Sequence, residues 1–402
     1  RVSYASAVYG APEIKAVTKV LSDPSRIVAG HAVKEFERRI AKLFGKRHGV
    51  MVNSGSSANL LALELLDLPT GSEIITPVLT FSTTIAPILQ KNLTPIFVDV
   101  EEGTYVVDAH VVERAITPRT KALMIPSLIG NIPDVKRLQR IAKKHRLWYI
   151  EDSCDTLGPL YKGKPTGAYT DISTTSFYAS HIITAAGGGG MVCTHNSGLA
   201  KRALLLSSWG RNSTLFGVHE QSEEFKKRFS KASILENQPY DAKFIFSEVG
   251  YNFQPTELQA AFGLAQLERL ASFMKKREQN FTQLYRFFKQ YEQFFILPKT
   301  LPEVKTAWLA FPLTIRDGAN FSRYECTRFL EHADIQTRPI VTGNVLRQPA
   351  FTHLAKNASK NAYPVTDAIM RNGFLIGCHH GMNNEHIAHL IRTFETFLSR
   401  YA

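Results

Sequence analysis

The sequence predicts an α/β protein in which a mainly parallel sheet is flanked by helices and is followed by a smaller C-terminal α/β domain. Short apolar runs alternate with helical segments through the first half of the chain. Strands separated by helices are typical of parallel sheets that are covered on both faces. With 402 residues and 44% hydrophobic content, the chain can also bury a large core divided between two subdomains. The expected strands are residues 50–52, 73–78, 95–98, 121–126, 147–151, 172–177 and 190–194.

Two amphipathic helices are expected before the first strand. Pro12 occupies an early helical position, and Asp23-Pro24 ends the first helix. The second helix has apolar residues at spacings of three and four and ends at Gly45. The apolar positions are Ile14, Val17, Val20 and Leu21 in the first helix and Val33, Phe36, Ile40, Leu43 and Phe44 in the second.

The second half of the chain begins with a long polar stretch and then becomes helical. Regular structure fades over residues 207–244, and a loop of this length predicts a lid or an arm that reaches a second subunit. Thr256 and Gln259 form a capping box, and helical composition continues to about residue 295 as a connecting helix. We therefore expect a large domain over residues 1–295 and a small domain over 296–402. The N-terminal segment 1–30 is a candidate for packing on the small domain.

The composition limits the classes of function and partner. The formal charge of +13 favours a generally basic surface, because Lys and Arg are dispersed, although it would also attract an anionic ligand such as a nucleotide diphosphate. No basic block interleaved with aromatics points to nucleic acid. No apolar run approaches ~18 residues, and no signal-peptide layout is visible, so we expect a cytoplasmic protein without a membrane partner. The four cysteines lack Cys-x-x-Cys spacing and predict reduced thiols.

One motif and two single residues at or after the ends of expected strands are candidates for binding a ligand. Gly55-Ser56-Ser57 lies between a strand and a helix, where free N–H groups and the positive helix end suit a phosphate, although an ordinary N-cap has the same pattern. Phe81 could stack on an aromatic cofactor, but a lone Phe is more often part of a core. Asp152 ends a buried strand, where an acid is costly unless it meets a cation; the alternative is a helix N-cap.

The stretch that decides the interpretation is 174–190. Ser176 ends a β-branched run, His181 follows five residues later, and glycines occupy 187–190. Together with Gly55-Ser56 and Asp152, this pattern resembles the DegT/DnrJ/EryC1/StrS sugar aminotransferases of fold type I, which use pyridoxal 5'-phosphate. In that family the fifth residue after the serine is the lysine that binds the cofactor covalently.

The resemblance covers nearly the whole chain and implies a role for each motif. The cofactor phosphate would be held by Gly55, Ser56 and Ser176, with Asn252 donated by the partner subunit of a homodimer whose active sites are shared. Phe81 would stack on the cofactor ring, and Asp152 would pair with its nitrogen.

The histidine places the chain near a small branch of that family. It resembles the 3-dehydrases of deoxysugar pathways, such as those that supply lipopolysaccharide O-antigens, which act on nucleotide-linked 4-keto-6-deoxyhexoses. One subtype carries an iron–sulfur cluster on a cysteine in the position of Cys154 and three more in the following loop. Residues 212–243 contain no cysteine, which leaves the metal-free subtype similar to the GDP-4-keto-6-deoxymannose 3-dehydratases. Gly187 departs from the glutamate common in relatives.

The resemblance implies a specific reaction. His181 would act as the catalytic base in removing the C3 hydroxyl, with the cofactor resting as pyridoxamine 5'-phosphate and L-glutamate restoring its amine. Arg211, Arg338 and Arg347 are candidates for contacting the nucleotide diphosphate. Two alternatives stay open: a reductive 3-dehydrase that takes electrons from an external donor, and a catalytically inactive protein that binds pyridoxal phosphate.

Overall fold

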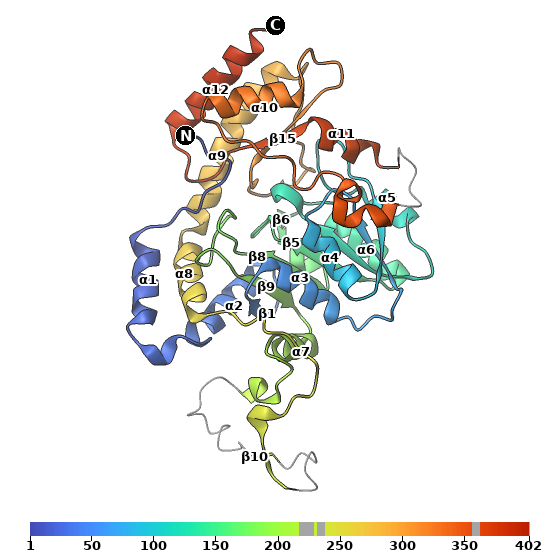
Figure 1. Ribbon diagram of the computed structural model, residues 1–402, viewed down its shortest axis with the longest axis vertical. Helices are drawn as coiled ribbons and strands as arrows, with labels where there is room; N and C mark the ends of the chain where they lie inside the picture. The colour runs from blue at the N-terminus through green and yellow to red at the C-terminus, as the bar shows by residue number, and fades with distance from the viewer. Residues whose placement is uncertain (217–228, 231–237, 356–361, 402) are drawn as a thin grey trace.

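The computed structural model describes residues 1–216, 229–230, 238–355 and 362–401. Its centre is a seven-stranded sheet in the order β1-β9-β8-β5-β4-β2-β3 (Figure 1). All neighbouring strands are parallel except β9, which is antiparallel to both β1 and β8. The prediction of a mainly parallel sheet is therefore confirmed. The strands are β1 His48–Val52, β2 Glu73–Pro77, β3 Thr94–Val98, β4 Thr120–Pro126, β5 Trp148–Ser153, β8 Ile172–Ser176 and β9 Gly190–Thr194.

Helices cover both faces of this sheet because successive side chains of each strand point to opposite sides. Val50 and Val52 of β1 pack in one layer with α3 and α7, whereas Met51 packs with α2 and α8 on the other face. The same alternation places α5 and α6 beside Leu123 and Tyr149. These helices are α2 His31–Leu43, α3 Gly55–Glu64, α4 Ser82–Gln90, α5 Ala109–Arg114, α6 Val135–His145, α7 Ser197–Ser207 and α8 Glu257–Glu268.

A second, antiparallel sheet lies at the other end of the molecule in the order β12-β14-β15 (Figure 1). Its core is aromatic: Phe288, Phe295, Phe311 and Phe394 are fully buried and their rings pack against one another. The sheet consists of β12 Phe295–Ile296, β14 Phe311–Ile315 and β15 Gly373–Ile376, with α9 Leu270–Phe288, α10 Arg323–His332, α11 Pro364–Asn372 and α12 Asn384–Leu398 around it. A short three-stranded sheet joins β6 Leu160–Tyr161, β7 Lys164–Pro165 and β13 Val304–Lys305.

The predicted connecting helix is interrupted, so the prediction of one continuous helix to residue 295 is wrong. The capping box at its start is present, since Thr256 and Gln259 exchange hydrogen bonds of 3.0 and 3.2 Å. Helix α8 ends at Glu268, and α9 begins after Arg269, which lies between the two helices with φ −100° and ψ −3°. At this break Arg269 Nη1 binds Glu13 Oε1 at 2.9 Å, and Gln266 Nε2 binds the same oxygen at 2.7 Å. The interruption thus anchors the N-terminal helix.

The N-terminal segment contacts the core around the small sheet and a helix that covers the central sheet. Val2 pairs with Ile335 and lies in the core of the small sheet, whereas α1 Ala11–Leu21 packs on α8. The apolar face of α1 is only partly covered, because Val20 is buried while Ile14 and Leu21 are each 56% exposed. The domain boundary at residue 295 stays a prediction.

Part of the expected lid or arm lies outside the described residues, in 217–228 and 231–237. The described parts are η4 Asn212–Phe216, the antiparallel pair β10 Phe229–Ser230 and β11 Tyr240–Asp241, and η6 Ala242–Phe244. The β10–β11 pair projects beyond α7, away from the central sheet (Figure 1). Whether this segment is a lid or an arm stays a prediction. Across the described ranges, none of the helices is long and apolar enough to cross a membrane.

The packing of Phe36 generates a stability prediction. Its ring is fully buried and lies 4.7 Å from the ring of Phe177, directly after β8. We expect Phe36→Ala to lower the free energy of unfolding by about 3–5 kcal/mol, because it leaves a cavity between α2 and the sheet. Urea denaturation measures this, with the exposed Tyr324→Ala as control, which should change stability by less than ~0.5 kcal/mol. Equal losses in the two variants would contradict the packing argument.

Candidate active site

The carboxylate of Asp152 is buried at the carboxyl end of β5. Its Oδ2 accepts hydrogen bonds from Asn59 Nδ2 of α3 at 2.8 Å and from Thr84 Oγ1 of α4 at 2.7 Å. Its Oδ1 accepts the backbone N–H of Cys154 at 3.1 Å. These neutral donors fix the carboxylate, and within the described ranges no cationic side chain forms an ion pair with it. A buried carboxylate held in this way is suited to receive a cation from a ligand.

The N-terminus of α3 lies against the end of β8. Ser54 is the N-cap, and its Oγ accepts the Ser57 N–H at 3.1 Å. A methyl group added to Gly55 would stand 2.6 Å from the Cβ of Ser176 and 2.8 Å from the Sγ of Cys154. Only glycine permits this approach, which leaves Ser176 at the positive end of a helix, the kind of position that binds phosphate. Ser56 is exposed nearby, and its Oγ donates to Thr83 Oγ1 at 2.9 Å.

His181 lies on the turn that joins β8 to β9. Its Nδ1 is 3.4 Å from the carbonyl oxygen of Ser176, and the ring of Tyr178 meets it edge-on at 5.9 Å. An Nδ1–H that donates to this carbonyl leaves Nε2 as the basic nitrogen. The half-buried imidazole therefore presents a proton-accepting atom beside the phosphate-type position.

Burial and a neighbouring carboxyl shift the pKa of His181 in opposite directions. Burial lowers the pKa of His181, whereas the Asp155 carboxyl acts to raise it. Burial raises the pKa of Asp155, and the imidazole opposes that shift. Asp155 Oδ2 also accepts the N–H of Ile129 at 3.0 Å. The net effect lowers the pKa of His181 and favours the neutral imidazole.

The remaining cofactor candidates lie around these groups. Phe81 is 54% exposed at the N-cap of α4, one turn before the Thr84 that binds Asp152. Asn252 is exposed and pairs with Ser208, and the adjacent Phe253 accepts the Asn53 N–H at 2.9 Å. Both residues therefore lie on segments that contact the start of α3 or α4.

The three candidate arginines are not brought together. Arg347 forms two bonds with Asp367, of 2.6 and 2.5 Å, so its charge is already neutralised. Arg338 Nη1 binds the carbonyl of Thr337 at 2.8 Å. The guanidinium of Arg211 stacks over Trp209 at 4.5 Å, and its Nε has no hydrogen-bond partner among the residues that the structure describes.

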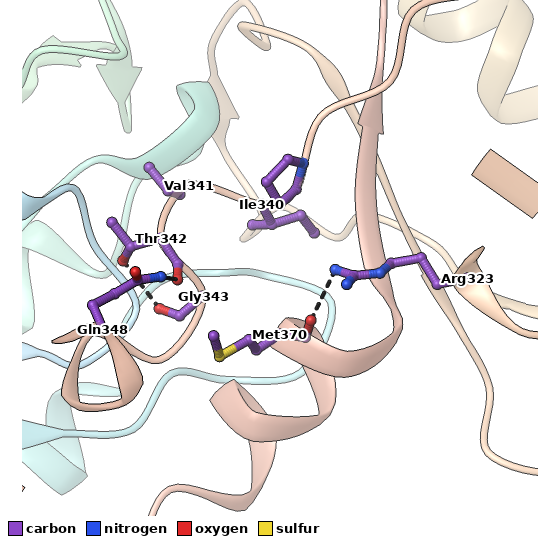
Figure 2. A pocket seen from close by; sticks show the side chains of 8 residues that line it. Arg323, Ile340, Val341, Thr342, Gly343, Gln348 and Met370 are labelled. Carbon is purple, nitrogen blue, oxygen red and sulfur yellow. Dashed lines mark hydrogen bonds between the residues drawn. The ribbon is translucent and has the colours of Figure 1, made fainter. Parts of the chain in front are cut away.

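A small hollow lies beside the segment that follows Arg338. Figure 2 shows Thr342, Gln348, Met370 and Arg323 around it, and its volume is about 140 Å³. None of the predicted site residues lines it. Ligand pockets for drug-sized molecules are usually ~300–1,000 Å³, so this hollow does not fit a nucleotide sugar.

The turn after His181 accommodates glycine specifically at position 187. Gly187 has φ +93°, a conformation that disfavours residues with a side chain, and its N–H binds Thr184 Oγ1 at 3.0 Å. Glycine in place of glutamate at position 187 therefore suits a tight turn with a left-handed backbone conformation. No other atom lies within 4 Å of a Cβ at this site, so the constraint comes from the backbone.

Two residues near His181 were not anticipated from the sequence. Asp155 could have been found, because it follows Asp152 by three residues at the same strand end. Arg277 Nη2 lies 3.5 Å from the carbonyl oxygen of His181, and it had no signal in the sequence, since 96 residues separate the two. Within the described ranges no group of three His, Cys, Asp or Glu side chains is placed to hold a metal ion.

The DegT/DnrJ/EryC1/StrS aminotransferase family model matches residues 9–395. The chain belongs to this family. The prediction of fold type I is thereby confirmed, and the family member described here has histidine at position 181.

Individual relatives of this DegT/DnrJ/EryC1/StrS member cover most of its length. Lipopolysaccharide biosynthesis protein RfbH of Salmonella typhimurium is 37% identical over 398 residues, covering 97% of this chain and 90% of the relative. The dTDP-4-dehydro-2,6-dideoxy-D-glucose 3-dehydratase of Saccharopolyspora spinosa is 36% identical over 384 residues, covering 93% and 82%. A crystal structure of GDP-4-keto-6-deoxymannose-3-dehydratase with a trapped PLP-glutamate geminal diamine matches with a TM-score of 0.85 and 27% identity, covering 98% of this chain and 100% of that one.

The close approach at Gly55 generates a binding prediction. We expect Gly55→Ala to weaken binding of pyridoxal 5'-phosphate at least tenfold, about 1.4 kcal/mol, because the methyl group pushes α3 away from Ser176. Equilibrium titration followed by absorbance measures the affinity. The control is Gly10→Ala, where an added methyl group meets no atom within 4 Å. Wild-type affinity in Gly55→Ala would show that this approach does not form the phosphate site.

Proposed function

We propose that this protein is a pyridoxal-phosphate-dependent 3-dehydratase of a nucleotide-linked 4-keto-6-deoxyhexose. The observation that carries the proposal is His181, which occupies the position of the family's lysine and lies beside Ser176 with Nε2 free. Imidazole cannot hold the cofactor covalently as lysine does. The cofactor would therefore be free to rest in its amine form, and an imidazole that can accept and release a proton would remain at this position.

The residues of the site fit the cofactor. The approach of Gly55 to Ser176 makes a cradle for the phosphate at a helix N-terminus, and the buried Asp152 carboxylate is oriented to receive a pyridinium N–H. Phe81 would cover the ring, and Asn252 of a second subunit would complete the phosphate site. When bound, pyridoxal or pyridoxamine 5'-phosphate supplies an electron sink and a primary amine for the sugar ketone.

We assign separate roles in this reaction to the side chains and carbonyls of the site. His181 Nε2 would take a proton from the cofactor carbon that carries the amine and would return a proton to the departing C3 oxygen. The Ser176 carbonyl would hold Nδ1–H and so fix the tautomer. Asn59 and Thr84 keep Asp152 in place, since both donate to its Oδ2. The neutral imidazole favoured by burial is the form that accepts a proton.

The relatives support the substrate class and the amine donor. One is named for a dTDP-linked sugar and another for a GDP-linked sugar, so both nucleotides belong in the assay. The GDP-linked compound is the first choice, and the geminal diamine in the matching crystal structure supports L-glutamate as the source of the amine. Removal of the C3 hydroxyl as water, with the two electrons supplied through the cofactor amine that L-glutamate restores, would give a 3-deoxy-4-keto sugar and ammonia.

A homodimer is supported by apolar side chains that one chain leaves uncovered. Val249 is 96% exposed, Phe244 and Phe246 are more than half exposed, and Ile14 and Leu21 of α1 are equally open. Phe244, Phe246 and Val249 are close together in the sequence, and a contiguous exposed apolar patch commonly marks a partner surface. Asn252 lies three residues after Val249, which would place it at such an interface.

The function is tested by replacing the histidine. We expect His181→Asn to lower kcat for formation of the 3-deoxy sugar roughly 10²–10⁴-fold, because the proton carrier is lost. Binding of pyridoxamine 5'-phosphate should stay within about twofold, since the cradle is unchanged. The assay uses GDP- and dTDP-4-keto-6-deoxyhexoses with L-glutamate, and exposed His332→Asn serves as control. Undiminished dehydration in His181→Asn would overturn the proposal.

The lowered pKa of His181 sets the expected pH dependence. Below its folded-state pKa the imidazole is protonated and cannot accept a proton, so kcat/KM should fall as the pH decreases through that value. Since burial places the pKa of His181 in the protein without substrate below the ordinary 6.5, we expect the acid limb of the kcat/KM profile to lie under pH 6.5. If the acid limb is absent from the pH profile of the residual activity of His181→Asn, the limb is assigned to His181. An acid limb centred above pH 6.5 would contradict it.

A further inference from the structure

Arg277 is a fully buried arginine in the middle of α9, and it contacts the turn that carries His181. Its side chain is 0% exposed and is among the largest fully buried ones in the described chain. Nη1 donates to the carbonyl oxygens of Trp308 and Leu309 at 3.2 and 2.9 Å, and Nη2 approaches that of His181 at 3.5 Å. Nε donates to Nδ1 of His380 at 3.2 Å. Three segments that are distant in the sequence therefore meet at one guanidinium.

The charge of Arg277 has no counter-charge nearby. All its acceptors are neutral, and in the part of the chain that the structure describes no carboxylate forms an ion pair with it. Burial lowers the pKa of Arg277 to about 10, so the group stays cationic at neutral pH. A buried charge without a carboxylate partner is costly, and here that cost is offset by hydrogen bonds to main-chain carbonyls and to His380.

His380 is the remaining hydrogen-bond acceptor of Arg277, and it is neutral. Its Nδ1 receives the Arg277 N–H, and its ring stacks on Phe273 with centroids 4.0 Å apart. Burial lowers the pKa of His380 to about 2, and the charge of Arg277 acts in the same direction. His380 therefore remains uncharged at every pH at which the protein would work, and the guanidinium is the only cation in this contact set.

We propose that Arg277 is a positioning residue for His181, because its planar fork holds the backbone of the catalytic turn against segment 308–309 and the turn at 379–380. This inference rests on the proposed role of His181 as proton carrier. Misplacing a catalytic group by about 1 Å costs ~10²-fold in rate, so a fork that fixes the turn would act on kcat rather than on substrate affinity.

The guanidinium also acts on His181 through its charge. The charged and titratable groups around the imidazole are the carboxyls of Asp155 and Asp152, which act to raise the pKa of His181, Arg277, which acts to lower it, and the phenol of Tyr178. Arg277 thus offsets part of the attraction that the two carboxyls exert on a proton at His181. Removing its charge should make the imidazole easier to protonate.

Three variants separate the fork from the charge. Arg277→Gln removes both, and Arg277→Lys keeps a cation without the planar fork. The matched control is Arg323→Gln: Arg323, like Arg277, donates to two main-chain carbonyls, those of Met370 and Gly373 at 2.8 and 3.2 Å, but it lies beside the small hollow of Figure 2 and not at His181. We expect kcat to fall at least ~10-fold in Arg277→Gln, less in Arg277→Lys and less than twofold in Arg323→Gln, with KM nearly constant throughout.

A second readout does not depend on activity. In protein labelled with ¹³C-histidine and free of cofactor, the His181 signal is identified by its loss in His181→Asn, and its titration gives the pKa directly. We expect the pKa of His181 to rise by a few tenths of a unit or more in Arg277→Gln and to stay near the wild-type value in Arg277→Lys and Arg323→Gln. If Arg277→Gln does not fold, the loss of kcat at unchanged pKa in Arg277→Lys remains the test of the fork.

The outcomes distinguish this inference from the proposed function. Wild-type kcat and an unshifted His181 titration in Arg277→Gln would overturn the positioning role while leaving the role of His181 intact. An equal loss of kcat in folded Arg323→Gln would also overturn it, since the effect would then be general. Dehydration that survives His181→Asn would instead refute the proposed function, and the titration would still report on the contact.

Discussion

The need to satisfy one buried carboxylate organises the centre of this protein. Asp152 ends β5 in a place where water does not reach it, so its oxygens must receive hydrogen bonds from the protein. The donors come from α3 through Asn59 and from α4 through Thr84. Asn59 also accepts a 2.6 Å bond from Thr174 of β8. The same few bonds therefore set the position of two helices and two strands around the site.

The chemistry of His181 depends on a balance between opposite charges. Two carboxyls, Asp155 and Asp152, favour a protonated ring, while burial and Arg277 favour the neutral one. Burial is the largest of these effects, so the pKa of His181 is lowered and the neutral ring, which can accept a proton, is favoured. Because Asp152 is held by neutral donors, its charge remains available to a ligand and to the histidine alike.

Much of the fold could be predicted from local sequence patterns, and the exceptions have physical causes. All seven strands of the central sheet were expected, since buried strands are short apolar runs between helices, and the capping box at Thr256 was recognisable. The break at Arg269 was not, because it depends on Glu13, more than 250 residues away. The site residues also fall into those that local motifs predict and those that they do not. Gly55 and Ser176 belong to recognisable motifs and do lie together, whereas the contact of Arg277 with the His181 carbonyl joins separate elements and leaves no local pattern. Arg347 was a reasonable candidate for an anionic ligand until Asp367 was seen to occupy its guanidinium.

The reversal of β9 within an otherwise parallel sheet has a consequence for how such an enzyme can change. The segment between β8 and β9 leaves and re-enters the same sheet, with Phe177 bonded to Gly189 at one end and Ala185 bonded back to Phe177. The side chain of the half-buried His181 takes no part in these backbone bonds. A lineage built on this scaffold could thus acquire a different reactivity through one codon at this position.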